Sequence, residues 1–226
     1  MKYILLCAFL LSVVPVSAQQ KFTKPDYRAI ERISKSKKED LSPDVLMLRY
    51  LSGDSSMTLR EQQQLYYGFQ FTPQYSPYTH SDYSDSLNQL LEKENLDVAD
   101  YIRASVFCDS VLKEDPFDLR ILNAQAAFYK KTARLTKASV NIARINIVLD
   151  AILASGDGLT GNTAFYVISV KHEYAILSAL DLKFGGKQSL IGSNDYLTLE
   201  ENDQQIKGLY FDVTASFNSL DKLFKD

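Results

Sequence analysis

The sequence predicts an α+β fold, with a mainly α-helical N-terminal two thirds followed by a small antiparallel β-sheet in the C-terminal third. Helical spacing of apolar residues dominates residues 96–152. After the glycine-rich segment 156–162, short runs of β-branched and aromatic residues replace that spacing. Helices first and strands last is an α+β order, so we expect a helical lobe over residues 19–156 and a small α+β lobe over residues 157–226, packed on it as one domain.

Residues 1–18 form a predicted export signal. Lys2 supplies a positive charge before an apolar run, residues 4–14, that is too short to span a bilayer. Pro15 and three small residues follow, ending at Ala18, before the chain becomes polar. We therefore expect cleavage after Ala18 and a periplasmic or extracellular mature protein.

Start signals in the sequence predict three short helices before residue 70. Pro25 and Pro43 open the first two, because proline is tolerated in the first helical turn, where its missing N–H has no partner to lose. Thr58 and Glu61 have the spacing of a capping box and open the third helix, which runs to Gly68.

Residues 66–78 are the densest aromatic stretch of the chain, and two prolines exclude a regular element from its second half. The rings could form an exposed ledge that binds sugars or proline-rich peptides. They could instead staple the loop to the core, which agrees with the large area that aromatic side chains bury. The candidate binding residues of the first interpretation are Tyr66, Tyr67, Tyr75 and Tyr78.

Three longer helices are predicted between residues 96 and 152. The first carries Cys108 on its apolar face, so we expect this thiol to be buried and unreactive. The third has apolar residues at alternating steps of three and four, which predicts a buried seam, with Asn141 and Arg144 pointing away from it. The residues of this seam are Leu135, Ala138, Ile142, Ile145, Leu149 and Ile152.

The first two of these longer helices resemble a tetratricopeptide unit. The first ends in Glu114, Asp115 and Pro116, and its partner is rich in alanine and aromatic residues over residues 126–129. A solenoid needs at least about three such repeats, so the resemblance implies a small helical layer and not a superhelix.

The final third is predicted to alternate short strands and helices. We expect strands over residues 163–170, 196–199 and 208–214, a helix over residues 172–182, a tight turn at Gly185 and Gly186, and a last amphipathic helix through Phe217 and Leu223.

Charge and motif content exclude several classes of function. Loss of Lys2 with the signal reduces 25 Lys and Arg residues to 24, against 28 Asp and Glu, so no basic surplus favours nucleic acid or anionic lipid. No apolar run of the mature chain is long enough to span a membrane. His172 and Glu173 begin a zinc-protease-like pattern, but Ile176 stands where the second histidine would be. We expect neither a metal nor another cofactor.

One polar cluster remains a candidate catalytic site: His172, Glu173 and Asp195. A histidine beside carboxylates can perform acid–base chemistry if the three groups meet within hydrogen-bond reach in a pocket. The alternative is that they are surface and hydrogen-bonding residues of a small sheet.

The order of several short motifs resembles the exported bacterial family catalogued as domain of unknown function 4919, of Bacteroidota-type bacteria. The resemblance covers nearly all the mature chain and implies export, but it implies no activity and no catalytic residues. The segments that carry it are residues 25–27, 49–50, 53–55, 65–71, 75–78, 164–168, 172–174, 195–197 and 208–213.

Two functions are therefore compatible with the sequence. The first is a non-enzymatic protein that binds a protein or peptide partner through its helical layer and aromatic loop. The second is a small hydrolase or carbohydrate-binding or carbohydrate-processing protein that uses the region of His172, Glu173 and Asp195, with the loop over residues 66–78 as a substrate ledge.

Overall fold

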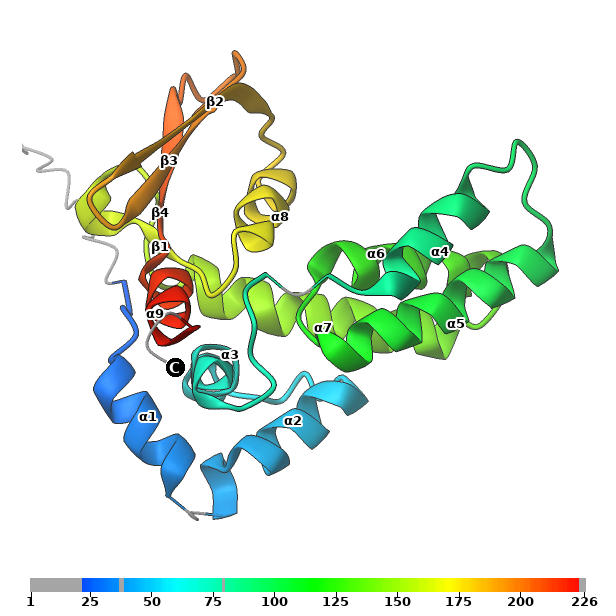
Figure 1. Cartoon of the computed structure of the whole chain (residues 1–226), viewed down its shortest axis with the longest axis horizontal. Coiled ribbons are helices and arrows are strands. Elements are labelled where there is room, and N and C mark those ends of the chain that lie inside the picture. Colours follow the sequence, from blue (N-terminus) through cyan, green and yellow to red (C-terminus); the bar gives the residue numbers. More distant parts are fainter. Residues whose placement is uncertain (1–21, 37–38, 79, 224–226) are drawn as a thin grey trace, which may run out of the picture.

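A computed structural model describes residues 22–36, 39–78 and 80–223. The predicted export signal, residues 1–18, lies outside them. The fold is α+β: a mainly helical N-terminal region precedes a four-strand mixed sheet. Figure 1 shows three parts, which we call the base (α1–α3), the arm (α4–α7) and the sheet lobe (β1–β4 with α8).

The base contains the three predicted short helices. Each begins where a side-chain oxygen of Asp26, Ser42 or Thr58 accepts a hydrogen bond from a free N–H of the first turn. The predicted capping box of Thr58 and Glu61 is confirmed. The elements are α1 (Tyr27–Lys35), the 3-10 turn η1 (Glu39–Leu41), α2 (Pro43–Ser52), α3 (Leu59–Gly68) and the 3-10 turn η2 (Phe69–Phe71).

The arm is a layer of four helices in which each packs against the next along the chain. The two central helices are the predicted tetratricopeptide-like pair, and Asp118 caps the second of them. The helix α4 was not predicted, because its buried face consists only of Ser84, Leu87 and Leu90. The elements are α4 (Asp82–Leu91), α5 (Val98–Glu114), α6 (Leu119–Lys131) and α7 (Leu135–Leu153).

The predicted seam of α7 is wrong in part. Leu135 is 63% exposed, and Ile142 is exposed as well, whereas Asn141 and Arg144 are buried. The buried face is displaced because neighbouring elements provide hydrogen-bond partners for these two side chains. Asn141 donates to Gln125 Oε1 over 2.8 Å.

Arg144 occupies the junction between the arm and the base. It donates to the Pro116 carbonyl over 3.3 Å, and its guanidinium lies 4.8 Å from the centre of the Tyr50 ring. The Tyr50 hydroxyl donates to the same carbonyl over 2.7 Å. A charge without a hydrogen-bond partner would be costly at this depth, and these contacts remove much of that cost.

The sheet has the strand order β1-β4-β3-β2. The strands β2, β3 and β4 pair in antiparallel, but β1 joins β4 in parallel and makes the sheet mixed. The strands predicted over residues 196–199 and 208–214 are confirmed as β3 and β4, whereas the strand predicted over residues 163–170 is reduced to the two residues of β1, and β2 was not predicted. The elements are the 3-10 turn η3 (Gly161–Thr163), β1 (Phe165–Tyr166), α8 (Lys171–Ala179), β2 (Phe184–Ile191), β3 (Asn194–Leu199), β4 (Gly208–Asp212) and α9 (Thr214–Leu223).

The strand β2 corrects the predicted turn at Gly185 and Gly186. Both glycines lie inside the strand, at a point where its register against β3 shifts. Gly186 has a φ of 85°, and a Cβ on Gly185 would lie 2.8 Å from the backbone of Leu199. The glycines therefore permit an irregular strand, and the hairpin turns instead at Gly192.

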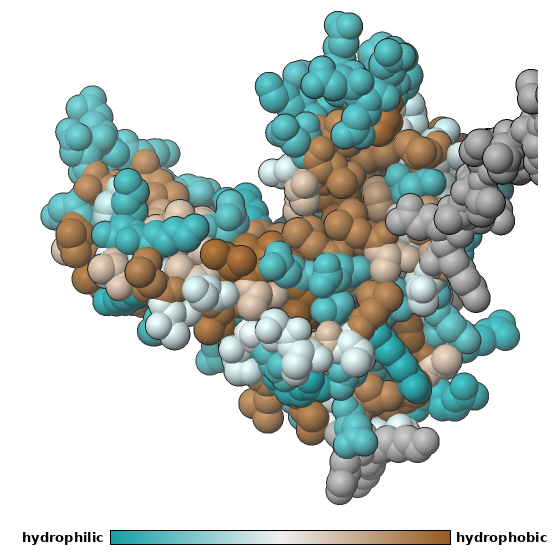
Figure 2. Space-filling view, turned by 180° about the vertical axis from the view of Figure 1, so that it is seen from behind, coloured by the Kyte–Doolittle hydropathy of each residue, from teal (hydrophilic) through white to brown (hydrophobic). Residues whose placement is uncertain are grey.

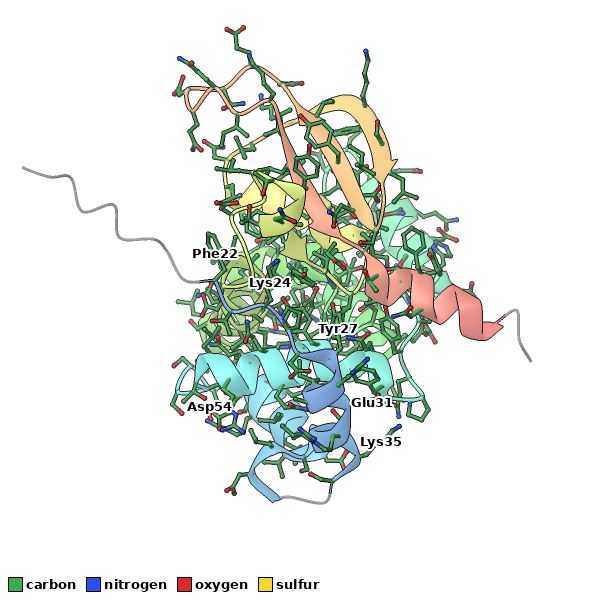
Figure 3. The ribbon with its side chains drawn as sticks, turned by 90° about the vertical axis from the view of Figure 1, so that its left-hand side faces the viewer. Phe22, Lys24, Tyr27, Glu31, Lys35 and Asp54 are labelled. Atoms are coloured by element: carbon green, nitrogen blue, oxygen red, sulfur yellow. The ribbon has the colours of Figure 1, made fainter. Side chains whose placement is uncertain are left out.

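One cluster of buried apolar side chains runs through the base, the arm and the sheet lobe. The free cysteine, Cys108, is buried within it, as predicted. At its edge, the Tyr27 ring meets Tyr67 and Tyr166 edge to face, with ring centres 6.0 and 6.3 Å away. Figure 3 shows Tyr27 at the end of α1 nearest the body of the protein, with Glu31 and Lys35 farther along the helix.

Candidate functional site

His172 is a fully buried histidine whose two ring nitrogens both have partners. Its Nε2 lies 3.0 Å from the Phe117 carbonyl, which can only accept, so Nε2 carries the proton. Its Nδ1 then accepts from the Tyr66 hydroxyl over 2.7 Å. Burial lowers the pKa of His172 below its ordinary value, so the ring is neutral and ties α8 to α3 and to the start of α6.

Glu173, the next residue of α8, is 0% exposed, and neither of its carboxyl oxygens has a hydrogen-bond donor within the described ranges. It interacts with the Asp195 carboxyl on β3. Burial, and then the Asp195 charge, raise the pKa of Glu173 to about 9. Glu173 is therefore protonated at neutral pH, which removes the repulsion between the two carboxyl groups.

Two exposed side chains, Gln188 and Tyr174, extend this pair to the surface. Asp195 accepts a hydrogen bond from Gln188 Nε2 over 2.8 Å, and Gln188 Oε1 accepts one from the Tyr174 hydroxyl over 3.4 Å. The Tyr174 ring packs edge-on against Phe184. The cluster thus joins the outer face of α8 to the strands β2 and β3.

The three candidate catalytic residues do not share one site. Glu173 meets Asp195, but His172 points into the core toward Tyr66 and Phe117. Successive residues of a helix are about 100° apart, which separates the two neighbours of α8. The geometry that acid–base catalysis by this trio requires is absent from the described structure.

The aromatic loop is mostly part of the core and corrects the ledge interpretation. Tyr66 and Tyr67 are 0% exposed, so their rings contact no ligand here. Tyr75 is half-buried and donates its hydroxyl to the Ile168 carbonyl over 2.6 Å. Of the four tyrosines proposed as binding residues, Tyr78 alone is well exposed. The rings therefore staple the loop to the core.

A cleft of about 620 Å³ lies where the sheet lobe meets the arm, between α6, α7 and α8. Seen from behind, apolar surface gathers in the angle between these two parts (Figure 2). The apolar wall consists of Leu119, Ile145, Leu149, Ala175 and Ala179, and the polar rim of Asp118, Arg120, Asn123, Lys171, Tyr174 and Ser178.

Sequence reasoning did not find this cleft. Ile145 and Leu149 were assigned to a covered seam, although both line the cleft and are only half-buried. The sequence contained one signal: the apolar stripe of α7 includes residues that the core does not cover. The residues of α6 and α8 on the other walls have no distinguishing pattern.

The described part of the chain holds no group of three or more His, Cys, Asp or Glu side chains that could share a metal ion. Within the same ranges, no helix has the length and hydropathy needed to cross a bilayer.

Comparison with known proteins gives one match. The family model described as domain of unknown function (DUF4919) matches residues 29–222. No curated protein and no solved structure matches this sequence.

Proposed function

The chain belongs to the family of domain of unknown function DUF4919, and from its geometry we propose that it is a non-enzymatic binding protein for a peptide or a protein segment. The observation that carries this proposal is the cleft between α6, α7 and α8. Its volume of about 620 Å³ is in the range of ligand sites.

The lining of the cleft suits a peptide. Leu119, Ile145 and Leu149 offer an apolar wall for one or two side chains. Asn123 and Ser178 on the rim can exchange hydrogen bonds with a peptide backbone. A ligand that is apolar on one side and rich in N–H and C=O groups on the other would satisfy both surfaces.

The arrangement of the polar residues supports binding over hydrolysis. His172 has both nitrogens occupied, and Glu173 is closed from solvent. Neither residue, nor Asp195, lines the cleft. The hydrolase predicted from this trio would need at least one of its three groups beside the bound substrate.

Export is part of the proposal. Residues 1–18 have the pattern of a cleavable signal, which would deliver the mature chain to the periplasm or the medium. The mature protein recovered from an exported fraction should then begin at Gln19. Recovery of an uncleaved chain that begins at Met1 from the cytoplasm would contradict this part.

The test of binding is selection of peptides from a displayed random library. The wild-type protein should enrich related sequences, and Ala175→Trp, which fills the cleft from α8, should not. Ala127→Trp places the same ring on an exposed position of α6 outside the cleft and should enrich the wild-type sequences. Equal enrichment by both variants, with unchanged thermal unfolding, would place binding elsewhere, and no enrichment by the wild type would remove the proposal.

A further inference from the structure

A second, smaller cavity adjoins the cleft. It has a volume of about 120 Å³ and lies beside the first residues of α4. Asp118, Arg120 and Lys171 line both cavities, so the two spaces meet at these three side chains. The cleft is mainly apolar, whereas the residues around the smaller cavity are mostly polar or charged.

The hydrogen-bond acceptors at this junction are already engaged. Asp118 Oδ1 accepts from the Ile121 N–H over 3.0 Å. Lys171 Nζ lies 3.1 Å from Asp115 Oδ2 and 3.7 Å from Asp118 Oδ2. Asp115 and Asp118 are largely buried, with side chains 17% and 4% exposed. Lys171 offsets one of these two negative charges, and both aspartates already accept a hydrogen bond from a protein donor.

Arg120, in contrast, is an exposed donor at the same place. Its guanidinium has no hydrogen bond or ion pair to any residue of the described ranges. A guanidinium presents five N–H groups in a planar fork that matches the two oxygens of a carboxylate. Asp115 and Asp118 are already paired with Lys171 and the Ile121 N–H. Arg120 therefore supplies the N–H donors at the junction that remain available to a ligand.

Ser81 adds a second unused donor. It precedes α4, a helix of ten residues, but its side chain does not cap that helix. Ser81 is 4% exposed and lines the smaller cavity, and its Oγ has no partner in the described structure. The N-terminus of α4 also favours an anion, and the acidic residues of its first turn, Asp82 and Asp85, are exposed and do not line the cavity.

We propose that the peptide bound in the cleft is anchored by its C-terminal carboxylate, which Arg120 and Ser81 receive in the smaller cavity while the last side chain, an apolar one, fills the cleft. A C-terminal residue carries its carboxylate and its side chain on the same Cα. The two groups can thus diverge into two cavities that meet at Arg120. This inference rests on the proposed peptide-binding function.

The probes are two pools of short synthetic peptides, random except for a final leucine, one with a free carboxylate and one with a C-terminal amide. Retention by the immobilised protein is measured by mass spectrometry. The wild type should retain the acid pool about tenfold or more above the amide pool, since a charge-assisted bond is worth roughly 1.5–3 kcal/mol. Arg120→Gln should lower retention of the acid pool alone. Arg103→Gln, an exposed position of α5 outside both cavities, is the matched control and should change neither pool.

The outcomes separate the two proposals. Equal retention of both pools, with both released by Ala175→Trp, would overturn the carboxylate anchor and leave the peptide-binding function standing. Retention of neither pool above a blank surface would overturn both. Loss of the acid pool in Arg103→Gln as well as in Arg120→Gln would show a non-specific effect of charge and would also overturn the anchor.

Discussion

The Glu173 carboxyl on α8 faces the Asp195 carboxyl on β3, and no N–H or O–H of any described residue reaches either Glu173 oxygen. Two interacting buried carboxylates would repel each other, so one of them retains a proton. Glu173 is the more deeply buried member of the pair. The contact between α8 and the sheet therefore depends on the protonation state of Glu173.

This pair predicts that stability falls as pH rises. The pKa of Glu173 is about 9 in the folded protein and near its ordinary 4.5 in the unfolded chain. Between these values the folded state binds the additional proton, so the free energy of unfolding decreases with pH, on the order of 1.4 kcal/mol per pH unit from this group. Glu173→Gln, which keeps a donor toward Asp195, should remove that slope in urea unfolding measured from pH 5 to 9.

The control for this measurement is Glu201→Gln, which removes one carboxyl from an exposed position. It should retain the wild-type dependence on pH. If Glu173→Gln retained it as well, Glu173 would be ionised in the folded protein and a different donor, or a bound cation, would have to face it.

His172→Ala should destabilise the protein by about 2–5 kcal/mol, because it opens a cavity and leaves the Tyr66 hydroxyl and the Phe117 carbonyl without their partner. His80→Ala removes an exposed ring whose polar contact within the described residues is with Asp85, over 3.4 Å, and it should cost little. Urea unfolding of the two variants measures the difference. Equal, small losses would mean that the His172 contacts contribute little to stability.

Cys108 should react slowly with thiol reagents in the native protein. It is 0% exposed, so a reagent cannot reach the sulfur. Burial also raises the pKa of its thiol to about 12, so the reactive thiolate is scarce at neutral pH. In a chain that starts after residue 18, Cys108 is the only thiol, and labelling should become rapid in denaturant. Cys108→Ala combined with Ser139→Cys, at an exposed position of α7, should label rapidly without denaturant. Rapid native labelling of Cys108 itself would show that α5 opens readily.

Two isoleucines on α7 should respond differently to truncation. Ile152 is 0% exposed, so Ile152→Ala should cost about 2–5 kcal/mol of unfolding free energy. Ile145 lines the cleft and is only half-buried, so Ile145→Ala should cost less, about 1 kcal/mol, while weakening peptide retention. Thermal unfolding and the peptide selection measure the two effects. Equal destabilisation by both changes would place Ile145 in the closed core.

Local signals in the sequence predicted the helix starts, because a cap such as Ser42 or Thr58 acts within its own turn. Periodicity predicted only part of the buried face of α7: Ala138 and Ile152 are buried, as predicted, but so are the unpredicted Asn141 and Arg144. Asn141 and Arg144 are buried only because Gln125 and Pro116, far away in sequence, provide partners.

Whether the three candidate catalytic residues meet is decided by the orientation of α8. The sequence placed His172, Glu173 and Asp195 in one region, and the structure joins only Glu173 with Asp195. Which side of a short helix faces the sheet is decided by packing from all its neighbours. The helix α8 has polar residues on several faces, so periodicity alone could not choose.

Four successive residues of α8 hold four different neighbours: Lys171 contacts Asp115, His172 contacts Tyr66, Glu173 contacts Asp195 and Tyr174 contacts Gln188. A single-residue insertion at the start of this helix would rotate the residues after it by about 100° relative to the rest of the protein. Every one of these contacts downstream of the insertion would then be lost together, whatever residue was inserted. Gly192, in the hairpin turn between β2 and β3, has open space around it, and an added residue there would displace little. Members of the family should accordingly vary in length at the hairpin and keep a constant length through α8.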